Sequence, residues 1–166
     1  MDAVKLFADE AERFAHWAET GTDTGGASAR NALLRLTTLY LRALELPLQW
    51  HGDDLCVDPL RVKDEEWMSV FKNASRLPLD FYGVVFDSTK VPPEEPVIGS
   101  LSDDIADIFR DVVLGLRLYN VGRVDAAVWV WVSSMTTHWG RHATSAVRAL
   151  HNWLADNEPW AFSTQA

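Results

Sequence analysis

The sequence predicts an all-α fold: a single-domain bundle of about five helices that ends in a long antiparallel helix hairpin. Apolar residues recur at helical spacing over five segments, whereas strand-like composition is confined to two short ones. With 166 residues, 48% of them hydrophobic, the chain is long enough to bury one core. We therefore expect one domain over residues 1–166, with an internal Pro-rich loop at 85–99 and a C-terminal tail at 157–166.

The first three helices follow from apolar stripes. The first is expected over residues 3–19, where apolar side chains recur every three or four positions and polar ones lie opposite. The second covers residues 28–45 and ends before Pro47, because proline disfavours helix in the residue that precedes it. The third runs from Asp64 to about Leu77, with acidic side chains at the positive end of its dipole.

The segment "FYGVVF" at 81–86 has strand-like composition. Residues 55–57, "LCV", offer the one pairing partner that we identify in the sequence. Because that partner is so short, we expect extended segments lying on the bundle and no sheet.

Two long helices close the chain. Ser100 is expected to cap the first of them, and "NVGR" at 120–123 turns into the second, which runs from about Val124 to Ala155. Because this connection is short, the two helices should be antiparallel neighbours. Counting outward from the turn places Trp131 opposite Val112 and near Gly115, where a missing side chain leaves room for an indole.

The strongest chemical signal lies between these two helices. His138 and His142 are one turn apart and share the core-facing side of the last helix. By the same count, His138 is level with Asp104 and Asp107, while His142 is level with Leu101. The predicted polar cluster consists of Asp104, Asp107, Asp111, His138 and His142.

This cluster has two interpretations. As a site, it could bind a divalent metal ion through His138, His142, Asp104 and Asp107, with Asp111 behind the ligands or acting as a base. As packing, an aspartate across the helix interface supplies the hydrogen bond that a buried histidine needs, which is the commoner arrangement.

Charge and composition limit the classes of partner. The chain has 15 basic and 24 acidic residues, a formal charge of −9, so nucleic acid and anionic membrane surfaces would be repelled. The longest uncharged stretch, 126–140, is too short to span a membrane. Met1 is followed by an amphipathic charged segment and not by a signal peptide, and a lone cysteine, Cys56, fits a reducing compartment. We expect a cytoplasmic protein.

Eight tryptophans are the other distinctive feature of the composition. Several, including Trp17 and Trp129, lie on the non-core sides of their predicted helices, where exposed indoles beside acids suit a protein-binding surface. The alternative is that the outer helices of the bundle cover them. A further possibility is a small-ligand pocket lined by Trp131, Met135 and Trp153.

Three segments agree in order with a known bacterial family. They are "LLRLTTLYLRALELP", "SLSDDIADIFRDVVLGLRLYNVG" and "THWGRHATSAVRALHNW". Over residues 5–155 the chain resembles the family called domain of unknown function 5063. The most specific matching positions are Asp103, Asp104, Asp107, Ile108, Asp111, Trp139, Gly140, Arg148, Ala149, Leu150 and His151. The resemblance implies a compact helical bundle, and it supplies no activity, substrate or catalytic residue.

The leading functional hypothesis from the sequence is a non-catalytic binding or regulatory protein without a cofactor. Its partner would be a protein, and a basic partner would complement the acidic, tryptophan-rich chain; a homo-oligomer is also compatible. The alternative is a metal-dependent hydrolase that uses the His/Asp cluster to hold a divalent ion.

Overall fold

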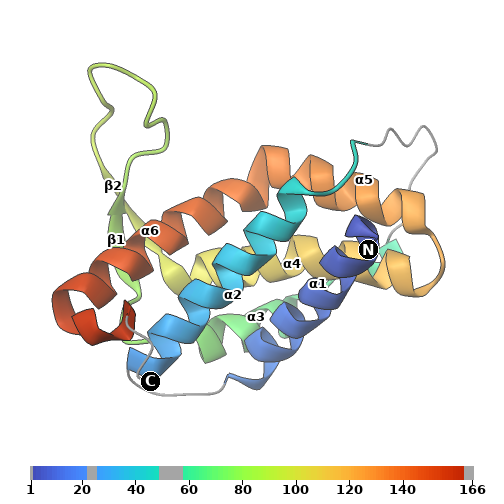
Figure 1. Ribbon diagram of the computed structural model, residues 1–166, viewed down its shortest axis with the longest axis horizontal. Helices are drawn as coiled ribbons and strands as arrows, with labels where there is room; N and C mark the ends of the chain where they lie inside the picture. Colours follow the sequence, from blue (N-terminus) through green and yellow to red (C-terminus); the bar gives the residue numbers. More distant parts are fainter. Residues whose placement is uncertain (1, 22–25, 49–57, 163–166) are drawn as a thin grey trace.

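The computed structural model describes residues 2–21, 26–48 and 58–162, and these form a helical bundle (Figure 1). Its elements are α1 (Ala3–Thr20), α2 (Gly26–Leu44), η1 (Asp58–Leu60), α3 (Asp64–Ala74), β1 (Phe81–Val84), β2 (Val97–Ser100), α4 (Leu101–Asn120), α5 (Val124–Ser134), η2 (Met135–Trp139), α6 (Gly140–Asn157) and η3 (Pro159–Phe162). Because α5, η2 and α6 form one continuous helical run, the prediction of an all-α bundle of about five helices ending in a long hairpin is confirmed.

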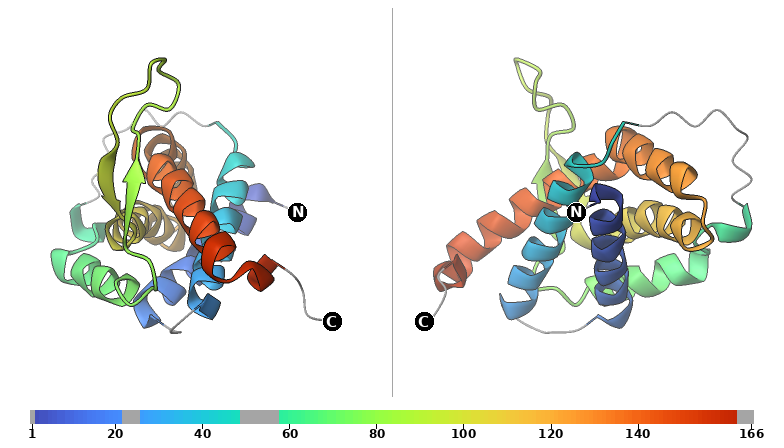
Figure 2. Two further views of the ribbon diagram at one scale, coloured as in Figure 1. Left: turned by 90° about the vertical axis from the view of Figure 1, so that its left-hand side faces the viewer. Right: turned by 45° about the vertical axis from the view of Figure 1, so that its right-hand side comes forward.

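Helix α4 is the centre of the bundle. It packs against α1, α3, α5 and α6, while α2 packs against α1 and α6, so α4 is surrounded on most sides (Figure 2). The core that results contains large, fully buried side chains from α1, α2, α4, α5 and η2: Phe7, Phe14, Leu36, Leu39, Phe109, Leu118, Trp131 and Trp139. Among the described residues, no helix combines the length and the apolar character that crossing a membrane requires.

The predicted contact between the last two helical rods is confirmed. Trp131 is fully buried, and its Nε1 donates a hydrogen bond of 2.9 Å to the carbonyl oxygen of Val112. A Cβ atom placed on Gly115 would lie 2.1 Å from the same Nε1, so the indole occupies the space that this glycine leaves. The start of α4 is also as predicted, because the Ser100 hydroxyl accepts a hydrogen bond from the backbone N–H of Asp103.

The helical run from α5 to α6 contains a π-helical turn, η2, which the sequence did not predict. The backbone N–H of Gly140 donates to the carbonyl oxygen of Met135, five residues earlier, where an α-helix would bond to the fourth. A Cβ atom on Gly140 would lie 2.4 Å from that oxygen. Glycine therefore permits the wide turn, which inserts one residue into the helical register just before His142.

The expectation that no sheet forms is wrong. Strand β1 pairs with β2 in an antiparallel hairpin, with Phe81 opposite Ser100 and Val84 opposite Val97. The pairing partner proposed from the sequence, 55–57, lies outside the described residues, as does Cys56. The true partner overlaps the predicted Pro-rich loop 85–99, whose residues 97–99 belong to β2.

The base of the hairpin is tied to the N-terminus of α4. The carbonyl oxygen of Asp80 accepts a 2.7 Å bond from the N–H of Leu101, and its carboxylate accepts from both the N–H and the hydroxyl of Ser102. The hairpin therefore stands at the end of α4 and projects away from the helices (Figures 1 and 2).

Candidate functional site

The structure brings together all five residues of the predicted polar cluster. Nδ1 of His142 lies 2.6 Å from Oδ1 of Asp104, and Nδ1 of His138 lies 2.9 Å from Oδ2 of Asp111. The two imidazole rings are 4.7 Å apart, edge to face. Two histidines from the last helical run thus meet aspartates of α4 across the interface.

The pairing within the cluster differs from the count made on the sequence. His138 was expected beside Asp104 and Asp107, but it bonds to Asp111, and His142 bonds to Asp104 where Leu101 was expected. Side chains on a helix lean toward its N-terminus, so on antiparallel helices the two members of a pair lean in opposite directions. The π turn shifts the histidines further in the same sense, because its wider turn advances less along the axis for each residue.

The hydrogen bonds define which nitrogen of each ring is free. A carboxylate only accepts hydrogen bonds, so each Nδ1 carries the proton, and Nε2 of the neutral ring keeps its lone pair. Both Nε2 atoms lie near the same carboxylate oxygen, each 3.9 Å from Oδ2 of Asp107. The two lone pairs and one carboxylate oxygen therefore converge on one point.

Asp107 is oriented from its other side. Its Oδ1 accepts a 2.8 Å hydrogen bond from the indole Nε1 of Trp67 on α3, and Nη1 of Arg110 lies 3.6 Å from the same oxygen. The Arg110 guanidinium also lies over the Trp67 ring, 5.2 Å from its centroid. These contacts hold Oδ1 and leave Oδ2 directed at the histidines.

Asp104 is oriented by the β-hairpin. The hydroxyl of Tyr82 on β1 donates a hydrogen bond to Oδ2 of Asp104, while Oδ1 holds His142. Burial and the Asp104 carboxylate together raise the pKa of Tyr82, so the phenol stays protonated and remains the donor. The hydrogen bond to Asp104 is also the main cause that raises the pKa of His142, against the opposing effect of burial. Neither Tyr82 nor Trp67 was identified from the sequence, because each contact joins segments that are distant along the chain.

The residues that converge here are of the types that bind metal ions. In the described part of the chain, Asp107, His138 and His142 each offer a ligand atom, and these atoms all lie within 4.8 Å of one another. Ligand atoms around tetrahedral zinc are about 3.3 Å apart, given bond lengths of roughly 2.0–2.2 Å. On binding an ion, the two Nε2 to Oδ2 distances of 3.9 Å would shorten by about half an ångström, and the histidine rings would also have to move closer to each other.

A cavity of about 390 Å³ opens beside the histidines, between the hairpin and the start of α6. Its lining comes from the hairpin, the first turn of α4 and the region around η2. His138, His142 and Asp104 belong to this lining, whereas Asp107 and Asp111 do not. One side of the imidazole pair is therefore accessible to a small molecule.

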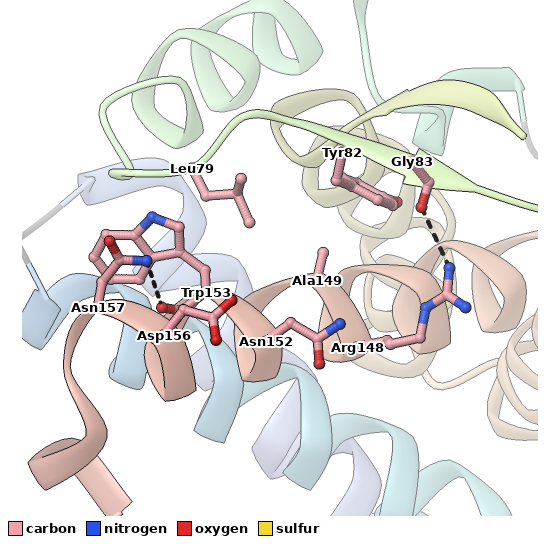
Figure 3. Close-up of a pocket in the computed structure, with 9 residues that line it drawn as sticks. All are labelled: Leu79, Tyr82, Gly83, Arg148, Ala149, Asn152, Trp153, Asp156 and Asn157. Atoms are coloured by element: carbon pink, nitrogen blue, oxygen red, sulfur yellow. Dashed lines mark hydrogen bonds between the residues drawn. The ribbon is translucent and has the colours of Figure 1, made fainter.

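The small-ligand pocket predicted from Trp131, Met135 and Trp153 is not formed. Trp131 has no exposed surface, and Met135 and Trp153 line two separate hollows. Figure 3 shows the hollow at Trp153, which lies between β1 and α6 and where Arg148 donates a 3.3 Å hydrogen bond to the carbonyl oxygen of Gly83. The sequence count placed all three on one helix face but could not show that Trp131 packs on α1 and α4, whereas Met135 and Trp153 lie beside α2 and β1.

The proposed surface of exposed indoles is also not observed. Of the described tryptophans, Trp131 and Trp139 are fully buried, and only Trp160 is largely exposed. Trp17 and Trp129 are half-buried, and Trp50 lies outside the described residues. The abundance of tryptophan in the described residues therefore mainly serves the packing of the bundle.

The fold and the cluster define a mostly helical domain with a His/Asp centre between its last two helical rods. The chain belongs to the family described as domain of unknown function (DUF5063), whose model matches residues 1–156. It is also similar to a crystal structure of protein BF1032 from Bacteroides fragilis, a structural genomics target, with 22% sequence identity, a TM-score of 0.75 and coverage of 91% of each chain. This likeness shows the fold alone. No curated protein matches the chain.

Proposed function

We propose that the protein binds one divalent transition-metal ion through Nε2 of His138, Nε2 of His142 and Oδ2 of Asp107, and that it acts as a metal-dependent hydrolase. The observation that carries this proposal is the shared position of Asp107 Oδ2, 3.9 Å from both nitrogens. Simple packing explains a single histidine paired with a single aspartate. It does not by itself bring the Nε2 atoms of two different histidines to one carboxylate oxygen, in the arrangement of a metal site.

The aspartates behind the histidines support the proposal. Histidines that bind metals usually donate their second ring N–H to a carboxylate or carbonyl, which orients the ring and increases its basicity. Asp104 and Asp111 take that position for His142 and His138. The proposal therefore assigns Asp104 to orienting His142, whereas the hypothesis from the sequence had it as a direct ligand.

Three protein ligands leave one coordination position for water, as in hydrolytic zinc sites and unlike structural sites with four protein ligands. An ion held by His138, His142 and Asp107 would lower the pKa of a bound water and so supply a nucleophile for hydrolysis near neutral pH. The cavity beside His138 and His142 would admit the substrate.

A second candidate is a non-catalytic binding or regulatory protein whose partner is a basic protein. It is supported by the formal charge of −9 and by exposed apolar side chains on the hairpin, among them Phe86 at 74% and Ile98 at 82% exposure. The tryptophans that first suggested it are mostly covered. This candidate needs no metal ion, so one titration separates the two functions.

The test is titration of chelator-treated protein with zinc, followed by calorimetry and thermal melting. We expect one ion per chain and a rise in the melting temperature, because an ion that binds only the folded state at 100 times its Kd stabilises it by about 2.7 kcal/mol. Magnesium serves as the control ion and should have little effect, since it prefers oxygen ligands to imidazoles. Melting that is indifferent to zinc, together with no stoichiometric binding, would reject the hydrolase and favour the second candidate.

A further inference from the structure

The cavity beside the histidines is lined by two charged side chains, Asp103, which is partly buried, and Arg141, which is exposed. Asp103 and Arg141 both line it, and neither side chain makes a hydrogen bond or an ion pair with another residue in the described part of the chain. The remaining carboxylate of the lining, Asp104, is already bonded to Tyr82 and His142. Asp103 and Arg141 are thus available to a ligand.

These two charges are of opposite sign and come from different helices. Asp103 directly precedes Asp104 on α4, and Arg141 directly precedes His142 on α6. Both face the cavity, yet they do not pair with each other. A molecule carrying one positive and one negative group could bridge them.

The local electrostatics agree with this geometry. Burial raises the pKa of Asp103, and the neighbouring carboxylates of Asp107 and Asp104 raise it further, against smaller opposing effects of His142 and Arg110. Arg141 contributes only slightly to lowering the pKa of Asp87, for which hydrogen bonds from Thr89 are the main cause. Each charge is therefore left incompletely neutralised.

The third wall of the cavity is apolar and comes from the hairpin. It consists of Val84, Val85, Phe86 and Ile98. The volume of about 390 Å³ falls in the range of small-molecule sites, roughly 300–1,000 Å³. The cavity thus combines one anionic group, one cationic group and an apolar surface at the scale of a single small molecule.

We propose that this cavity binds a small zwitterion of the amino-acid class with an apolar side chain. Its ammonium group lies at Asp103, its carboxylate binds the Arg141 guanidinium, and its side chain packs on the hairpin wall. The assignment of this molecule as substrate or product rests on the proposed hydrolase, because the histidines at the cavity edge would place the ion beside it. The binding of the zwitterion itself does not depend on the proposed hydrolase.

The test compares three probes by calorimetry, in both metal-free and zinc-titrated protein: L-leucine, N-acetyl-L-leucine without the ammonium, and L-leucinamide without the carboxylate. We expect L-leucine to bind at least about tenfold more tightly than either of the others, a difference of about 1.4 kcal/mol. Arg141→Gln should weaken L-leucine and N-acetyl-L-leucine but not L-leucinamide. Asp103→Asn should weaken L-leucine and L-leucinamide but not N-acetyl-L-leucine.

Matched controls are Arg61→Gln and Asp9→Asn, which change exposed ion-paired residues that do not line the cavity and should leave all three affinities unchanged. Equal affinity for the three probes, or affinities unaffected by both cavity substitutions, would overturn the inference. If zinc does not bind but the charge-selective pattern is present, the hydrolase fails and the inference stands. If zinc binds without that pattern, the inference alone fails.

Discussion

Replacing His138 with alanine is expected to weaken zinc binding by at least about 100-fold, because loss of residues that merely orient metal ligands already costs about 10- to 100-fold. The substitution removes one of the three proposed ligand atoms while leaving Asp107 and His142 in place. The His138 side chain is 45% exposed, so its loss should not unfold the protein. Calorimetric titration with zinc measures the change in affinity, and circular dichroism verifies that the helices are intact.

Two further variants are expected to give an intermediate and an unchanged affinity for zinc. Asp104→Asn keeps both imidazoles but weakens the hydrogen bond that orients His142, so we expect a loss of about 10- to 100-fold. His151→Ala removes an exposed histidine of the same helix, which stacks on Phe162 outside the cluster, and should bind zinc like the unchanged protein. If His138→Ala and His151→Ala bind zinc equally well, the ion is not held by the His/Asp centre.

Replacing Gly115 with alanine is expected to destabilise the fold by about 2–4 kcal/mol. The new methyl group would lie 2.1 Å from Nε1 of Trp131, an indole already in contact with Phe7 at 4.7 Å between ring centroids. The ring would have to move, and its buried N–H would lose the Val112 carbonyl. Alanine's better helix propensity offsets only about 1 kcal/mol of this cost. The midpoint of thermal unfolding should fall by roughly 5–15 °C.

A second glycine provides the control for this prediction. A Cβ atom on Gly83 meets no neighbour within 4 Å, so Gly83→Ala should leave the melting temperature almost unchanged. The double variant Gly115→Ala/Trp131→Phe should be more stable than the sum of the two single effects, since phenylalanine is smaller and has no N–H to satisfy. If the stability losses of the two single variants add up to the loss of the double variant, contact with the indole is not what destabilises Gly115→Ala.

The helical part of the fold was predictable because its signals are local. The apolar stripes, the Ser100 cap and the short turn before Val124 suffice to place two antiparallel rods side by side, and that arrangement correctly pairs Trp131 with Val112 and Gly115. The β-hairpin was missed because the segment "VIGS" of β2 is too short to be distinguished from the proline-containing loop before it. The π turn was missed because its single inserted residue leaves the apolar pattern nearly intact.

The sequence was enough to predict which residues form the candidate site, but not what each of them does there. The sequence placed the five members of the cluster at one interface, because all five lie on two adjacent helices. It did not show that Asp107 faces both histidines, since that depends on Trp67, a donor 40 residues away along the chain. The link from Tyr82 to Asp104 likewise depends on a hairpin whose position follows from tertiary packing.

X-ray absorption at the zinc edge of the titrated protein tests the central claim most directly. We predict two imidazole nitrogens and two oxygens, one from Asp107 and one from water, at roughly 2.0–2.2 Å from the ion. A spectrum without imidazole scattering, or one with a sulfur ligand at about 2.3 Å, would place the ion elsewhere and contradict the account.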